Sequence, residues 1–215
     1  MKKTASILNL LVIMLLACAF TSCERDEDTD RSMCLSGQWR GDWGMYYVYN
    51  YRGHDYQFDS YDTDIVFYPD YNYVTHGYGY QVDWYEFGPY ERLSYRFTWN
   101  VRDGVIYLTY PGYHDYDADI YRYGLDNDYF TGYFNNGGTR FRLSKIRDYY
   151  NWDYYRPYGD YYFWTNSSWS WNSYYKPLRS ATRNEYVVQS DSMHVSSSGL
   201  SEGRVVRIGN RNMGK

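Results

Sequence analysis

A strict alternation of apolar and polar residues between Leu93 and Val101 constrains the fold of this chain more than any other feature. The apolar side chains share one parity and the polar side chains share the other: Leu93, Tyr95, Phe97, Trp99 and Val101 against Ser94, Arg96, Thr98 and Asn100. Since side chains alternate across a β-strand, this run predicts a strand that is buried on one face only. A one-sided strand is typical of an antiparallel sheet, so we expect an all-β fold.

Turn signals divide the rest of the chain into short strands. Asp103-Gly104 and the Asn-Asn-Gly-Gly segment at 135–138 are hairpin signals. The predicted strands cover residues 39–49, 64–68, 71–85, 93–101, 105–110, 116–123, 128–134 and 139–146, and no helical period separates them. An antiparallel meander of eight strands can close into a barrel and so remove its edges. We therefore expect an eight-stranded β-barrel over residues 35–148.

The head of the first strand carries a resemblance to a known family. Gly37-Gln38-Trp39 resembles the Gly-x-Trp opening of lipocalin-like barrels. The resemblance implies that Trp39 plugs the closed end of the barrel and that a basic residue from the last strand packs over it. Arg140 and Arg142 are the matching candidates. The chain departs from lipocalins because it lacks a disulfide and a recognisable helix after the barrel.

The N-terminus resembles a bacterial lipoprotein signal. A basic start and an apolar run from Ala5 to Phe20 lead to Thr21-Ser22-Cys23 and then to acidic residues. The run is short for a membrane-spanning helix, and a plain secretory signal is the alternative. The resemblance implies removal of residues 1–22 and lipidation of Cys23. Residues 23–34 resemble the acidic leash of lipoproteins anchored in the outer membrane and facing the cell exterior.

Tyrosine is unusually abundant, with 32 residues, and most of them lie between Tyr46 and Tyr175. Tyrosine favours strands and combines an apolar face with a polar tip. Residues 149–175 are rich in Tyr and Trp but have no steady period, so we expect a low-complexity aromatic extension. Residues 176–215 form a basic tail that we expect to be mostly disordered. We therefore expect residues 35–148 to fold without either segment.

The sequence offers little catalytic chemistry. After lipidation of Cys23, only Cys34 remains in the mature chain, and no nucleophile–base pair stands out. His54, His76 and His114 lack the spacing of metal ligands, and the acidic run 115–119 departs from a calcium loop at Ile120. We expect no enzyme activity, no cofactor and no metal. The net charge of −4 also disfavours a nucleic acid partner.

Two functions remain open. The first is a non-enzymatic binding module for a small apolar molecule or a glycan, which would meet Tyr47, Tyr95, Phe97 or Trp99 in the barrel. The second is a structural or adhesive envelope protein that acts through protein contacts of its Tyr/Trp-rich surface. An interior cavity of at least about 300 Å³ would favour the first function, whereas a filled interior with exposed aromatic patches would favour the second.

Overall fold

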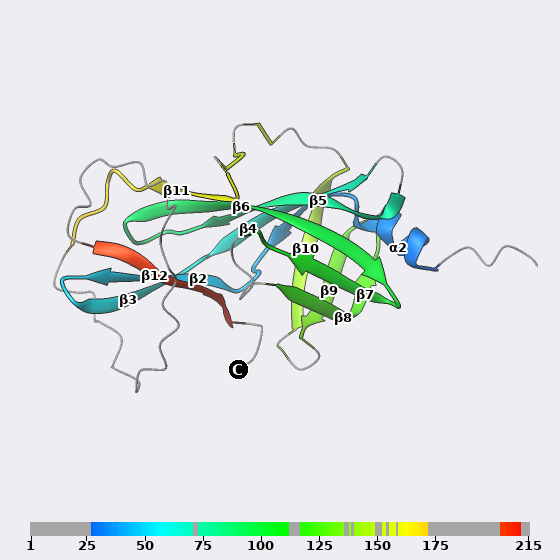
Figure 1. The fold of residues 1–215 in the computed structure, drawn as a ribbon, viewed down its shortest axis with the longest axis horizontal. Helices are drawn as coiled ribbons and strands as arrows, with labels where there is room; N and C mark the ends of the chain where they lie inside the picture. Colours follow the sequence, from blue (N-terminus) through cyan, green and yellow to red (C-terminus); the bar gives the residue numbers. More distant parts are fainter. Residues whose placement is uncertain are drawn as a thin grey trace, which may run out of the picture.

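A closed antiparallel barrel of eight strands forms the body of the computed structural model (Figure 1). The structure describes residues 27–70, 73–111, 117–135, 138, 140–148, 152–153, 155–157, 159–171 and 203–211. Around the barrel the strands are β1 (Gly37–Gly41), β4 (Asp62–Asp70), β5 (Tyr73–Trp84), β6 (Tyr90–Arg102), β7 (Val105–Thr109), β8 (Ala118–Leu125), β9 (Tyr129–Phe134) and β10 (Arg140–Arg147). Because β10 pairs with β1, the predicted eight-stranded antiparallel barrel is confirmed.

The first predicted strand, residues 39–49, is wrong as one strand. β1 ends at Gly41, and β2 (Met45–Tyr51) belongs to a second, three-stranded sheet with β3 (His54–Asp59) and β12 (Gly203–Asn210). A tight turn separates the two strands, because the Asp42 carboxylate accepts the Gly44 N–H at 2.8 Å and Gly44 has φ of 82°. The alternation of residue types continues through residues 42–44, but the pairing partners change from β4 and β10 to β3 and β12.

The long strand β6 connects the barrel to this second sheet. Residues Arg92–Asn100 of β6 pair with β5, while its first half pairs with β11 (Tyr161–Thr165) and its end from Thr98 pairs with β7. Figure 1 shows β11, β6 and β5 lying over β12, β2 and β3 at the end of the molecule away from the helix. Tyr47 on β2 contacts the rings of Tyr90 and Phe163 at 5.7 and 6.4 Å, so one hydrophobic core runs through both parts.

The C-terminal segments differ from the prediction. The aromatic extension contributes β11 and the buried side chains of Trp152 and Phe163. The tail contributes β12, whose Val205 and Ile208 are buried. In β12 the register shifts between Val205 and Arg207, which puts two buried residues three positions apart and hides the two-residue period. Residues 35–148 are therefore not a structurally separate unit.

A helix replaces most of the predicted leash. α2 (Glu27–Leu35) contacts β4, β5, β6 and β8, and β4 and β8 stand on opposite sides of the barrel, so the helix covers one barrel end. The Asp28 carboxylate accepts the backbone N–H groups of Asp103 and Gly104 at 2.8 and 3.1 Å. Only Ser32 and Leu35 are buried, so the helix lacks the apolar stripe that reveals helices in sequences.

The signal segment and Cys23 lie outside the described residues. Among the described residues, no helix has the length and the apolar content that a membrane-spanning helix requires.

Candidate functional site

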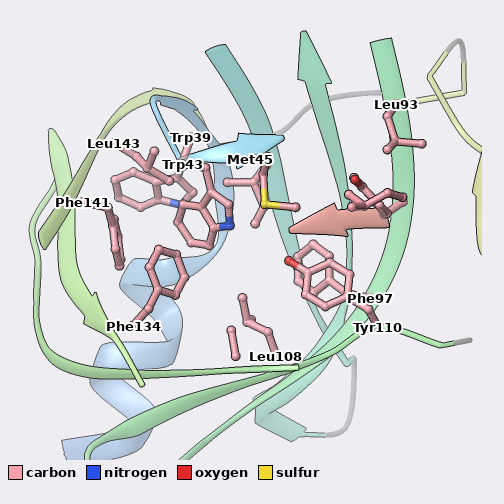
Figure 2. Packing of buried hydrophobic residues seen from close by; sticks show 14 of the residues in the cluster. Trp39, Trp43, Met45, Leu93, Phe97, Leu108, Tyr110, Phe134, Phe141 and Leu143 are labelled. Carbon is pink, nitrogen blue, oxygen red and sulfur yellow. The ribbon is translucent and has the colours of Figure 1, made fainter. Parts of the chain in front are cut away.

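The four aromatic residues predicted to meet a ligand are core residues instead. Tyr47, Tyr95, Phe97 and Trp99 are each at most 2% exposed. Figure 2 shows Phe97 among the packed side chains of the interior, and its ring lies 5.3 Å from that of Phe67. Neighbouring rings occupy the space around Tyr47, Tyr95 and Phe97, so these three residues are not placed to meet a ligand in the interior. Trp99 is buried from the inside of the barrel but lines the groove described below.

Two glycines on β5 explain how such large rings fit. Gly77 and Gly79 are the cross-strand partners of Trp99 and Phe97. A Cβ at Gly79 would collide with the Phe97 ring and the Val66 carbonyl. A Cβ at Gly77 would collide with the Tyr68 carbonyl and lie 3.0 Å from the Trp99 ring. Because neither glycine has a side chain, the rings from β6 take up the space that two residues would otherwise share.

Trp39 is buried at the barrel end, as the resemblance implies, but the cation beside it is not one of the two predicted arginines. Trp39 is fully buried and donates its Nε1–H to the Leu35 carbonyl at 2.8 Å. Arg140 and Arg142 are exposed on the outer face of β10, so their predicted role over Trp39 is wrong. Lys145 takes that place, with its Nζ 5.3 Å from the Trp39 ring centre.

Strand parity accounts for this exchange. Phe141 and Leu143 are buried inside the barrel, and Lys145 shares their parity. Arg140 and Arg142 have the opposite parity and therefore face outward. Counting the parity from the apolar residues of the last strand would have selected Lys145 from the sequence.

A buried polar cluster surrounds Asp83 inside the barrel. The Asp83 carboxyl is fully buried and accepts the Thr63 hydroxyl at 2.7 Å and the Gln81 amide at 2.9 and 3.1 Å. The Tyr95 hydroxyl lies near this carboxyl and favours its charged form, and the Tyr110 hydroxyl donates to the side-chain oxygen Oε1 of Gln81 at 2.7 Å. Burial raises the pKa of Asp83 to about 7, although the surrounding donors oppose this shift.

Sequence reasoning missed this cluster. The signal available in the sequence was parity. Gln81 and Asp83 share the inward parity of Gly77 and Gly79 on β5, so two polar side chains point into the barrel. The cluster can hold a proton near neutral pH, but its burial keeps Asp83 away from ligands in solution. Its hydrogen bonds join β4 to β5 and β5 to Tyr110, the residue that follows β7.

The best candidate for a binding site is an open groove on the outside of the barrel, which we name the outer groove. Its volume is about 400 Å³ and it crosses β5, β6 and β7. Its lining residues are Asp70, His76, Gly77, Tyr78, Thr98, Trp99, Asn100, Tyr107 and Thr109. These side chains combine aromatic rings with amide, hydroxyl, imidazole and carboxylate groups.

Strand register arranges the outer groove as two rows across three strands. One row consists of His76, Asn100 and Tyr107, and the other consists of Tyr78, Thr98 and Thr109. Tyr78 and Tyr107 thus stand at diagonal corners, roughly 12 Å apart from the usual strand spacing and rise. The polar groups of Asn100 and Thr98 lie in the middle column, between the two aromatic rings.

Tyr78 is exposed but held in place. Its side chain is 47% exposed, and its ring stacks on that of Tyr68 at 5.3 Å. Its backbone carbonyl accepts the Trp99 Nε1–H at 3.1 Å. Next along β5, Tyr80 stacks on Trp152 of the extension at 6.4 Å. A supported, exposed ring of this kind can stack on a flat ligand without losing much side-chain freedom.

Comparison with known proteins adds no assignment, since no protein-family model, curated protein or solved structure matches this chain. Among the described residues, no group of three or more His, Cys, Asp or Glu side chains gathers as a metal site would require. His114, one of the three histidines weighed as metal ligands, lies outside the described residues. The geometry of the outer groove is therefore the main guide to function.

Proposed function

We propose that this protein is a non-enzymatic binding module that holds a glycan in the outer groove. The observation that carries this proposal is the grid of the outer groove, in which Tyr78 and Tyr107 flank Asn100 and Thr98. Sugars present apolar faces that stack on aromatic rings, and hydroxyl groups that bond to amides and side-chain hydroxyls. The diagonal placement of the two rings suits a ligand of more than one sugar ring.

The chemistry of the outer groove supports binding rather than catalysis. The groove is open to solvent, whereas catalytic sites gain much of their electrostatic power by excluding water. His76 lies 3.9 Å from the Asp70 carboxylate, and both side chains are nearly half exposed. These two groups can bond to ligand hydroxyls from the rim of the groove.

The filled interior favours the alternative function, adhesion through the Tyr/Trp-rich surface, over a ligand held inside the barrel. The packing of the aromatic extension within the chain counts against a role of the extension in such contacts. Trp152 and Phe163 are buried against the strands, and Trp171 stacks on Tyr51 of β2 at 4.1 Å. Trp169 packs edge-on against Phe58 of β3 at 5.6 Å. These rings of the extension are therefore engaged in packing within the chain.

The proposal includes the cellular location. We propose that lipidation of Cys23 anchors the module in the outer membrane, facing the cell exterior, where glycans of the surroundings are accessible. The support for this part is the lipoprotein-like signal in residues 1–23.

A binding screen tests the proposed function. The purified mature chain is applied to an array of neutral oligosaccharides, and any hit is measured by calorimetry with Tyr78→Ala and Phe87→Ala. Phe87 is a suitable control because its side chain is 55% exposed and does not line the outer groove. We expect Tyr78→Ala to weaken binding at least about tenfold, a loss of 1.4 kcal/mol, and Phe87→Ala to have no effect. Equal affinities of both variants and the wild type would exclude the outer groove.

A further inference from the structure

A second groove lies on the outside of β8, β9 and β10, and we name it the arginine groove. Its volume is about 530 Å³, and its lining includes Gly124, Asp126, Tyr129, Thr131, Arg140 and Arg142. It shares no lining residue with the outer groove. Its chemistry is also different: the guanidinium groups of Arg140 and Arg142 line it, whereas the outer groove has the Asn100 amide and the His76 imidazole.

An irregularity in β8 makes room for the arginine groove. The β8–β9 register shifts between Tyr121 and Gly124, and Arg122 within the shift has a left-handed φ of 48°. Gly124 is then paired with Thr131, where a Cβ would lie 3.2 Å from the Thr131 hydroxyl oxygen. The missing side chain leaves this hydroxyl accessible beside the arginines.

The two arginines are placed as a pair. Arg140 and Arg142 alternate with the buried Phe141 on β10, so both face outward, roughly 7 Å apart along the strand. The Arg142 guanidinium carbon lies 3.8 Å from the centre of the Tyr129 ring. Such close stacking fixes the plane of the guanidinium and leaves its N–H edge available for a planar, two-oxygen partner.

Among the lining residues of the arginine groove, positive charges outnumber negative ones. Asp126 is its only acidic lining residue, and its Oδ1 accepts the N–H groups of Asp128 and Tyr129 at 2.8 and 2.6 Å. These bonds, with a smaller contribution from Arg142, hold the pKa of Asp126 below its usual value. One ionised carboxylate therefore faces two guanidinium groups, in a protein whose net charge is −4.

We propose that the arginine groove binds a small ligand through one oxyanion group, a carboxylate or a sulfate ester, held by Arg142 and Arg140. The excess of one positive charge matches a monoanion. The stacked Arg142 supplies the two-point hydrogen bond, Arg140 adds a second cation, and Thr131 supplies a hydroxyl for the remainder of the ligand. This proposal is independent of the glycan proposal, because it concerns other residues on other strands.

The test uses the full mature chain and four probes: D-glucuronate, its neutral counterpart D-glucose, inorganic sulfate and sodium chloride. Binding is followed by calorimetry and by salt dependence. We expect saturable binding of glucuronate or of sulfate. Comparing these two probes shows whether the groove prefers a carboxylate or a sulfate group. We also expect weakening by added salt, because exposed charges are screened. Glucose and chloride are expected to compete poorly.

Matched variants locate the binding. Arg142→Gln should weaken oxyanion binding at least tenfold. Arg142→Lys should weaken it less, because lysine keeps the positive charge although it cannot make the two-point hydrogen bond of the guanidinium. Arg207→Gln is the control, since Arg207 is an exposed arginine 5.5 Å from the Tyr46 ring in the second sheet. Arg207→Gln and Tyr78→Ala should both leave oxyanion binding unchanged.

Three results would overturn this proposal. The first is equal binding of glucose and glucuronate together with no binding of sulfate. The second is an equal effect of Arg142→Gln and Arg207→Gln, which would indicate general attraction of anions. The third is loss of oxyanion binding in Tyr78→Ala and not in Arg142→Gln, which would move the anion to the outer groove.

Discussion

Lys145 on β10 lies over the indole of Trp39 on β1, with its Nζ 5.3 Å from the ring centre, and the two residues are register partners across the seam that closes the barrel. The Lys145 ammonium also forms an ion pair with Asp148 at 2.8 Å. The first and last strands of the barrel are thus joined by hydrogen bonds and by a cation above a buried aromatic ring.

Replacing Lys145 tests this contact. Lys145→Met keeps the apolar stem and removes the charge, so we expect the free energy of unfolding to fall by about 0.5–2 kcal/mol. Arg140→Met, an exposed basic residue on the same strand, should change it by less than about 0.5 kcal/mol. Trp39→Ala should cost about 3–5 kcal/mol, as for other buried aromatic residues. Urea unfolding measures all three, and equal effects of the two Met variants would contradict the assignment.

Asp83 should make stability dependent on pH. Its pKa is about 7 in the folded protein, because of burial, against about 3.9 in an unfolded chain. Protonation of Asp83 therefore favours the folded state fully below about pH 4, and this contribution is lost as the pH rises toward 7. At about 1.4 kcal/mol per pH unit, the loss is of the order of 4 kcal/mol.

Asp83→Asn isolates this effect, since its amide stays neutral at every pH. We expect the variant to gain stability relative to the wild type between pH 4 and pH 8, measured by denaturant unfolding at several pH values. Asp103→Asn, at a side chain that is 87% exposed, is the control. A constant difference between wild type and Asp83→Asn across this range would show that the carboxyl stays ionised.

Truncation tests the role of the C-terminal segments. A chain that ends at Asp148 loses β11, β12 and the buried side chains of Trp152 and Phe163. We expect it to aggregate or to melt with little cooperativity, because the core residues Tyr47 and Tyr90 lose the cover of Phe163. A chain that ends at Arg211 keeps all of these elements and should melt like the full chain. A cooperative melt of the shorter chain would show that the barrel folds without the C-terminal segments.

The lipid anchor has a direct test. Cys23→Ala should release the protein from membranes, because the acyl chains that hold it are attached to this thiol. Cys34→Ala changes an exposed cysteine at the end of α2 and should leave the protein in the membrane fraction. Fractionation after a high-salt wash compares the two variants. Retention of Cys23→Ala in the membrane fraction would exclude Cys23 as the anchor.

The sequence was a good guide wherever the relevant signal was local. The alternation from Leu93 to Val101 and the turn at Asp103-Gly104 predicted the β6–β7 hairpin, because parity and turn chemistry depend on adjacent residues. The same reasoning predicted the order of the barrel strands. It placed a single strand over residues 39–49, because residues 42–44 keep the parity of the residue types while the chain passes from the barrel to the second sheet.

The candidate sites depended on contacts that the sequence does not display. Parity alone predicted that Phe97 and Trp99 face inward, but Gly77 and Gly79 across the strand decided that these rings fill the interior. The outer groove requires side chains from three strands in two rows, and the arginine groove requires the register shift beside Gly124.

Sequence by itself determined the all-β class, the succession of hairpins and the inward or outward side of most barrel residues. These properties follow from a two-residue period and from turns a few residues long. Tertiary structure decided which rings meet, where a groove remains open and that Gly203–Asn210 joins β2. The physical reason is that lateral neighbours in a sheet are set by register and by barrel closure, which bring together residues far apart in the chain.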